Sequence, residues 1–182
     1  MKKLLSIVCL LASSSCLAEQ HQIGVDSFVG VVDGKLTEGT DSLNDIVTQH
    51  YLLSYQYKLT DNWDIKAGYL FGDSEDFGLI FDEFTDTALE YTGPTIGVTG
   101  KFDLTRRNSL FMDVNTINYD YEMVDDGRTK VSETGWGYTA NLGWQYAFDN
   151  GFGIKAAYGY SQFGDDVDIG SFSFGVSYRF GS

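Results

Sequence analysis

The last third of the chain alternates strictly between apolar residues and small or polar residues, and this period of two restricts the fold more than any other feature. Every second residue from 136 to 148 is apolar. These residues are Trp136, Tyr138, Ala140, Leu142, Trp144, Tyr146 and Phe148. Because successive side chains of a β-strand point to opposite faces, the pattern predicts a strand with one apolar face and one polar face.

Two further strands with the same design follow this one. Asn150-Gly151 separates the first alternating run from the next, and Asn-Gly between two such runs is a strong hairpin signal. Residues 152–160 and 171–180 then repeat the alternation of large apolar residues with Gly, Ser, Ala and a few charges. The end of the chain therefore predicts three consecutive antiparallel strands.

The earlier part of the chain predicts five more strands. They cover residues 22–32, 47–58, 63–71, about 96–102 and 109–119. The phase of the fifth strand is ambiguous, and we place Leu110, Met112 and Val114 on its apolar face. Proline cannot donate to a ladder, so we expect a bulge or the frayed end of a strand at Pro94. The total is eight strands.

The links between the predicted strands alternate in length. The short links are 59–62, 103–108 and 149–151, whereas the long links are 33–45, 72–90, 120–134 and 163–169. Short turns on one side, long loops on the other and an even number of strands of about 9–11 residues are typical of a bacterial outer-membrane barrel.

The apolar faces are expected to point outward. A soluble barrel of the lipocalin type would show the same period with its faces reversed. However, the interior of an eight-stranded barrel is only just wide enough for side chains, and the many Trp, Tyr and Phe of the apolar faces do not fit there. The opposite faces carry small and polar residues, which suit a narrow lumen. The prediction is an all-β, eight-stranded antiparallel transmembrane up-and-down β-barrel.

The N-terminus has the pattern of a secretory signal peptide. Two lysines precede an apolar run from residue 4 to 12, and small residues lead to Ala18. We expect a signal peptide over 1–18 and a barrel domain over 19–182. The apolar run is too short for a membrane anchor, and lipidation at Cys16 is disfavoured because no Leu stands three residues before it. Both cysteines, Cys9 and Cys16, lie in this peptide, so the exported chain has no disulfide.

The negative charge is concentrated in the long links. The formal net charge is −14, and the four long links hold 19 acidic and three basic residues. The rest of the exported chain holds seven of each sign. We therefore expect acidic loops on the extracellular side. A sequence pI near 4.2 disfavours nucleic-acid binding.

Several charged residues fall on the predicted inner faces of the strands. They are Asp26, Asp64, Lys66, Lys101, Asp113, Lys155 and Arg179. Charges inside a narrow barrel are tolerable when they are paired. We expect a network that plugs the lumen, and a proton or ion path is the alternative.

No catalytic motif and no cofactor or metal site is predicted. The only histidines are His21 and His50, and a structural hydrogen bond is the favoured role for His50. A lipid-modifying enzyme, in which His50 works with Ser54 one pleat away, is a weaker alternative. Acidic segments 73–76 and 165–168 could hold Ca²⁺ loosely, but we expect them to be solvated.

The link 72–90 mixes acids with apolar residues. The apolar ones are Phe77, Leu79, Ile80, Phe81 and Phe84. They form a candidate interaction surface. The alternative is that the neighbouring strands continue above the membrane as a ribbon and bury these side chains.

The final segment 175–180 resembles the closing strand of small outer-membrane barrels of the OmpX/Ail and opacity-protein type, and the layout is similar to the N-terminal barrel of OmpA. In that group the terminal aromatic strand, here Tyr178 and Phe180, is the signal read by the barrel-assembly machinery. Gly181 and Ser182 depart from the pattern by following the last aromatic residue.

The resemblance implies an integral, non-enzymatic outer-membrane protein of a Gram-negative bacterium. It implies contact with lipid and lipopolysaccharide, a monomeric state and a role in surface adhesion, surface interaction or envelope integrity. A narrow porin-like channel and a lipid A-modifying enzyme are the alternatives. Such roles depend on loop sequences and do not transfer from the fold alone.

Overall fold

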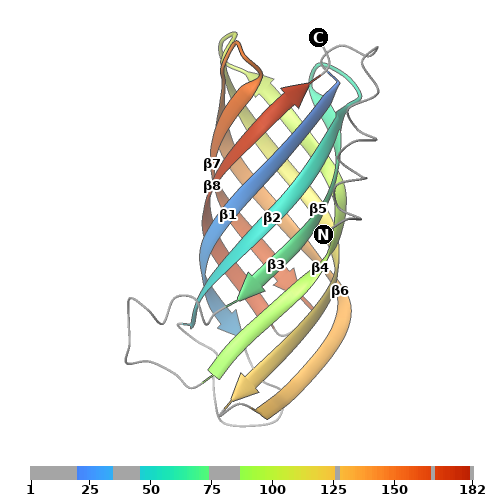
Figure 1. The fold of residues 1–182 in the computed structure, drawn as a ribbon, viewed down its shortest axis with the longest axis vertical. Helices are drawn as coiled ribbons and strands as arrows, with labels where there is room; N and C mark the ends of the chain where they lie inside the picture. The colour runs from blue at the N-terminus through green and yellow to red at the C-terminus, as the bar shows by residue number, and fades with distance from the viewer. Residues whose placement is uncertain (1–19, 35–45, 74–86, 126–127, 165–166, 181–182) are drawn as a thin grey trace, which may run out of the picture.

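The computed structural model describes residues 20–34, 46–73, 87–125, 128–164 and 167–180, which form a barrel of eight strands (Figure 1). The strands are β1 (His21–Gly34), β2 (Ile46–Lys58), β3 (Trp63–Asp73), β4 (Thr87–Asp103), β5 (Asn108–Asp125), β6 (Arg128–Ala147), β7 (Phe152–Phe163) and β8 (Val167–Phe180). Within these residues there is no helix long and apolar enough to cross a membrane.

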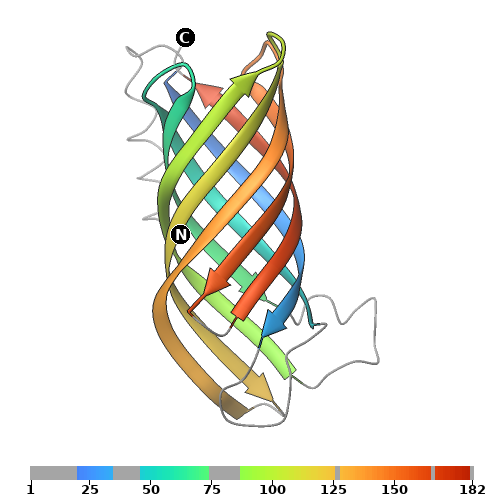
Figure 2. The same ribbon diagram turned by 180° about the vertical axis from the view of Figure 1, so that it is seen from behind.

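The strands close on themselves in simple up-and-down order. Each strand pairs antiparallel with the next, and β1 also pairs with β8. At the seam, His21 lies opposite both Tyr57 of β2 and Phe180 of β8. The view from behind shows the same continuous wall of tilted strands (Figure 2). The predicted fold class is confirmed.

Exposure alternates over most of the described side chains of the strands, in the direction expected for a barrel in lipid. On β8, Phe172 and Phe174 are 67% and 73% exposed, whereas the alternating residues Ser171 and Ser173 are buried. The phase of β5 is also as predicted, because Leu110, Met112 and Val114 are exposed. Large apolar side chains on the outside form the lipid-facing band of a transmembrane barrel.

The strands next to the long links run further than predicted. β5 continues to Asp125 and β6 begins at Arg128, so the predicted link 120–134 is wrong, and only 126–127 lie outside these strands. The reason is that the pairing of β5 with β6 continues past Tyr121, with one register shift between Met123 and Val124. The link 163–169 shortens in the same way, since β8 begins at Val167.

Pro94 neither marks a bulge nor lies at the end of a strand. It lies inside β4, opposite Tyr69 of β3. On its other side, the pairing of β4 with β5 skips Gly93 and Pro94 and resumes in the same register at Thr95. The strand tolerates the missing donor because the ladder is interrupted on one side only.

Candidate functional site

The lumen contains two layers with different chemistry, and the first lies in the half nearer the short turns. Here Lys155 Nζ lies 2.8 Å from both carboxylate oxygens of Asp26. Lys66 Nζ lies 2.5 Å from Asp113 Oδ2, and Thr99 donates a hydrogen bond of 2.6 Å to Asp113 Oδ1. Lys101 and Asp64 form a third ion pair. We call these three pairs the ion-pair layer.

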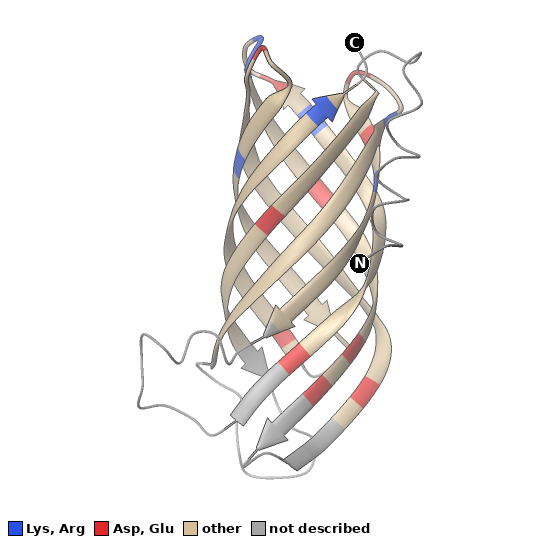
Figure 3. Ribbon diagram, viewed as in Figure 1, with Lys and Arg blue, Asp and Glu red and all other residues tan. Residues whose placement is uncertain are grey.

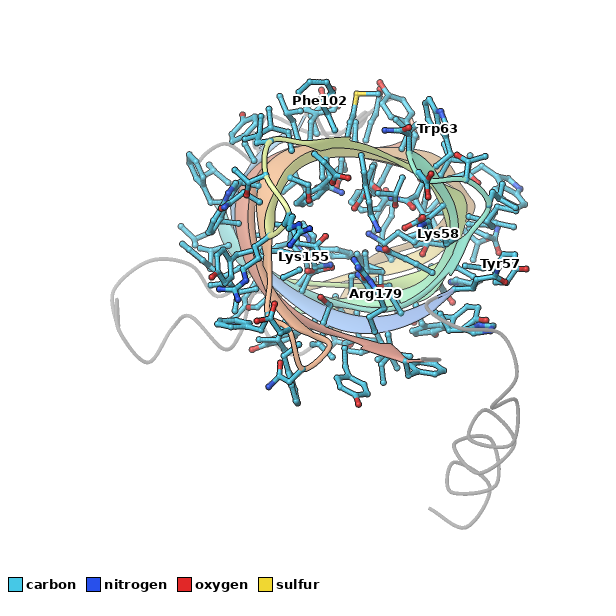
Figure 4. All side chains as sticks on the ribbon, turned by 90° about the horizontal axis from the view of Figure 1, so that it is seen from above. Tyr57, Lys58, Trp63, Phe102, Lys155 and Arg179 are labelled. Carbon is cyan, nitrogen blue, oxygen red and sulfur yellow. The ribbon has the colours of Figure 1, made fainter. Side chains whose placement is uncertain are left out.

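The ion-pair layer brings together six of the seven charged residues assigned to the lumen from the sequence. Its pairs join β1 to β7, β3 to β5 and β3 to β4. The seventh residue, Arg179, forms no ion pair with the described residues and points into the barrel at the turn-side mouth (Figure 4). Both members of the Lys66–Asp113 pair are nearly fully buried, at 1% and 4% side-chain exposure. Because an uncompensated buried charge costs several kcal/mol, each such residue needs its partner.

The second layer, the aromatic layer, lies in the half nearer the long links. It consists of Phe28, His50, Tyr91, Tyr119, Tyr121 and Phe163 with the surrounding Ile, Leu and Val side chains. Phe28 stacks on His50 at a ring distance of 4.5 Å, and the Tyr91 hydroxyl lies 2.8 Å from His50 Nδ1. Phe163 contacts both Tyr91 and Tyr119, at ring distances of 5.2 and 5.4 Å.

The aromatic layer was not predicted, and the expectation of a polar lumen is wrong in this half of the barrel. Large rings fit because glycines lie opposite them. A Cβ at Gly72 would be 2.3 Å from the Tyr91 ring, and a Cβ at Gly135 would be 2.5 Å from the Tyr119 hydroxyl. Glycine facing an inward aromatic residue on a neighbouring strand is the signal that could have revealed the layer.

The structure does not bring His50 and Ser54 into a nucleophile–base pair. The Ser54 hydroxyl donates a hydrogen bond of 3.5 Å to the backbone oxygen of Gly24, and His50 contacts Phe28 and Tyr91 instead. Among the described residues there is also no group of three or more His, Cys, Asp or Glu that could hold a metal ion.

The two ends of the barrel differ in charge. Among the residues whose side chains are described, carboxylates gather toward the long-link ends of β4, β5 and β6, whereas Lys and Arg lie closer to the short turns (Figure 3). Glu90, Asp120, Glu122 and Glu133 are exposed there, and Glu90 lies directly opposite Glu122. The residues assigned to a loop interaction surface (Phe77, Leu79, Ile80, Phe81 and Phe84) lie outside the described residues, as do the acidic segment 74–76 and the pair 165–166.

The two residues assigned to the assembly signal lie at the closing seam. Phe180 stacks against His21 at a ring distance of 5.6 Å, and Tyr178 packs against Phe152 of β7 at 4.9 Å. Both strands that flank β8 therefore contact this signal through aromatic rings.

A family model described as an outer membrane protein beta-barrel domain matches residues 4–180, nearly the whole chain. The chain belongs to this outer-membrane β-barrel family. It is therefore an integral outer-membrane protein, and in this family the short turns face the periplasm and the longer links face outward. No curated protein matches the sequence.

Solved structures of other small barrels are similar in fold. Neisserial surface protein A superposes with a TM-score of 0.70 at 15% identity, over 88% of this chain and 97% of that one. Ail, the attachment invasion locus protein of Yersinia pestis, gives 0.61 at 20% identity over 90% and 100%. The N-terminal barrel of Pseudomonas aeruginosa OprF gives 0.57 at 13% identity over 89% and 99%. At these identities the likeness concerns the fold alone.

Proposed function

We propose that this outer-membrane barrel is a non-enzymatic surface protein whose long-link end binds positively charged partners, in adhesion, surface interaction or envelope integrity. The observation that carries the proposal is the exposed acidic face of β4 and β5. Glu90 and Glu122 are directly opposed across the two strands, and Asp120 lies opposite Thr92 in the next row. None of these carboxylates forms an ion pair with another described residue.

The electrostatics of this face favour a cationic partner. Like charges directly opposite each other weaken the pairing of strands. A positively charged surface would relieve that repulsion and would also be attracted over a distance of about 10 Å at moderate salt. Because the carboxylates are exposed and unpaired, they need no rearrangement to engage it.

A comparison with Ail sharpens this proposal. Ail has been solved in complex with sucrose octasulfate, a heparin analogue and a dense polyanion. The long links of this chain carry 19 acidic and three basic residues, which would repel such a ligand. We therefore infer the opposite ligand preference within a shared fold.

The filled lumen supports a surface role over a channel. Ile117, Ile169 and Tyr91 are at most 2% exposed, so their side chains pack closely and narrow the lumen at this level of the barrel. The ion-pair layer, in the half nearer the short turns, adds a second obstruction of the lumen. The proposal also includes a monomer in contact with lipid and lipopolysaccharide, assembled by machinery that reads Tyr178 and Phe180.

The direct test is binding to cells that display the protein. A fluorescent oligolysine peptide should bind in a salt-dependent manner, and a labelled heparin should not bind. The triple variant E90Q/D120N/E122Q should lose most of the peptide binding. Its matched control, D61N/D103N/D149N, removes the same charge at the turn side, where all three residues are exposed. Equal binding by both variants and the unchanged protein would contradict the proposal.

The loop surface is tested separately. Residues 74–86 are replaced by a Gly/Ser segment of the same length, which removes five apolar and five acidic residues and leaves Glu90, Asp120 and Glu122 in place. Attachment of displaying cells to host-cell monolayers and resistance to detergent should fall. If adhesion and envelope resistance both stay unchanged, residues 74–86 have no part in the function.

A further inference from the structure

A cavity of about 500 Å³ lies at the turn-side mouth of the barrel. Its wall includes the turn between β6 and β7 and the end of β8. Three arginines reach it, Arg106, Arg107 and Arg179. The view into this mouth shows Arg179 pointing inward from the barrel wall (Figure 4).

Two of these three positive charges are not neutralised within the described residues. Arg107 is bound to Asp149, with Nε donating to Oδ1 at 3.1 Å and a second contact to Oδ2. Arg106 and Arg179 have no such carboxylate partner. The cavity therefore has a positive balance that no described contact compensates.

Polar side chains inside the mouth have unused hydrogen-bonding capacity. Gln145 and Ser177 line the cavity and are only 4% and 5% exposed. A Cβ at Gly153 would lie 2.8 Å from the Ser177 hydroxyl and 3.2 Å from Gln145 Nε2, so both groups lie close together. Neither side chain makes a hydrogen bond to another described residue, and neither is among the fully buried polar groups that lack a partner. Their polar atoms are therefore open to the cavity, where they can bond to water or to a ligand.

The outer side of the same cavity is aromatic. Phe148, Phe152, Tyr178 and Phe180 line it. Phe148, Phe152 and Tyr178 are exposed on the lipid-facing side of the wall. Aromatic residues at the end of a transmembrane barrel lie at the level of the lipid headgroups. The cavity thus joins the positive mouth of the lumen to the inner leaflet of the membrane.

We propose that this cavity binds a phosphate group between Arg106 and Arg179, with Gln145 and Ser177 donating hydrogen bonds to it. The planar guanidinium matches phosphate oxygens in a bidentate geometry, which suits arginine to this role. Free phosphate and the headgroup of an inner-leaflet phospholipid offer the same chemistry. The aromatic side favours the lipid, because acyl chains would then contact Phe152 and Tyr178.

The test uses the full folded barrel in detergent micelles and has two arms. Native mass spectrometry with added phosphatidylglycerol measures retained lipid, and ³¹P line broadening measures binding of inorganic phosphate. R106Q and R179Q should each weaken binding about tenfold, as expected for loss of one charge-assisted contact. R106Q changes an exposed turn residue, so it remains informative if R179Q does not fold.

The matched control is K58Q, which removes one positive charge at the same end of the barrel from a residue that does not line this cavity. Binding should be unchanged by K58Q. Broadening of phosphate without retention of phosphatidylglycerol supports the site with free phosphate as its ligand, and retention of the lipid supports the phospholipid. Binding of neither probe, or an equal loss in K58Q and R106Q, would overturn the proposal.

Discussion

The two halves of the lumen are filled in different ways. The turn-side half is held by three ion pairs whose side chains are at most 12% exposed, whereas the half near the long links is held by aromatic rings packed against glycines. Ion pairs depend on the presence of both partners, and ring packing depends on volume. One narrow lumen is thus filled by paired charges at one end and by close-packed rings at the other. Mutations in the two halves should therefore lower the stability of the barrel for different reasons.

The largest effect is expected in the ion-pair layer. Lys66→Ala leaves the Asp113 carboxylate buried and unpaired, and should lower the free energy of unfolding by about 3–5 kcal/mol. The double variant K66M/D113L removes both charges and should recover most of that loss, because replacing a buried pair by apolar residues is often neutral. Urea unfolding in lipid vesicles measures both. A double variant as unstable as the single one would contradict the pairing.

A smaller effect is expected in the aromatic layer. Gly72→Ala places a methyl group against the Tyr91 ring and should cost about 1–3 kcal/mol through overpacking. The control is Gly170→Ala, whose Cβ would meet only the Tyr158 hydroxyl, at 3.1 Å. The same unfolding measurement compares them, and equal stability of the two variants would show that the layer is loosely packed.

The hydrogen bond inside the aromatic layer should contribute less. Tyr91→Phe keeps the ring and removes the hydroxyl that lies 2.8 Å from His50 Nδ1. The expected loss is about 1 kcal/mol, the net value of one buried hydrogen bond. If H50F and Y91F lower stability by fully additive amounts, the two residues do not interact.

The smallest effect is expected at the surface, in the turn between β2 and β3. The hydrogen bond and positive charge of Lys58, 2.8 Å from Asp61, lower the pKa of Asp61 below its ordinary value. A lowered carboxyl pKa gives stability above the unfolded pKa that is lost as the pH falls through the folded pKa. Asp61 is fully exposed, so K58Q should change the dependence of the free energy of unfolding on acidic pH only slightly. A large change would show that Lys58 interacts with groups other than Asp61.

The sequence pattern assigned charged residues to the inner faces of the strands, but it did not assign the partner of each charge. Strict alternation is enough to place Lys66 and Asp113 inside, because a shift of one residue would turn every side chain to the other face. Alternation shows which face of its strand a residue occupies. It does not give the position of the residue along the barrel axis, because the strands are tilted and staggered relative to one another. The Lys155–Asp26 pair joins residues that are 129 positions apart in sequence, and its formation depends on closure of β1 with β8.

The aromatic layer was missed for a different reason. Tyr121 and Phe163 lie where strand ends were assigned to loops, and Tyr91 lies between the predicted link 72–90 and the predicted start of its strand near residue 96. Strand ends are the positions that periodicity defines least well. Of the glycines that admit these rings, Gly72 was assigned to a link and Gly135 lies between a predicted link and a predicted strand, so neither could be matched to an opposing ring.

Single-channel recording in planar bilayers tests most directly whether the lumen is a filled structural core or a conducting path. With purified, folded protein, we predict no discrete conductance steps, because the aromatic layer and the ion-pair layer obstruct the lumen in succession. K66M/D113L should also show no conductance steps, because the aromatic layer still fills the lumen. Stable, ion-selective steps that change in size in this variant would contradict the account and identify the ion-pair layer as a conducting path.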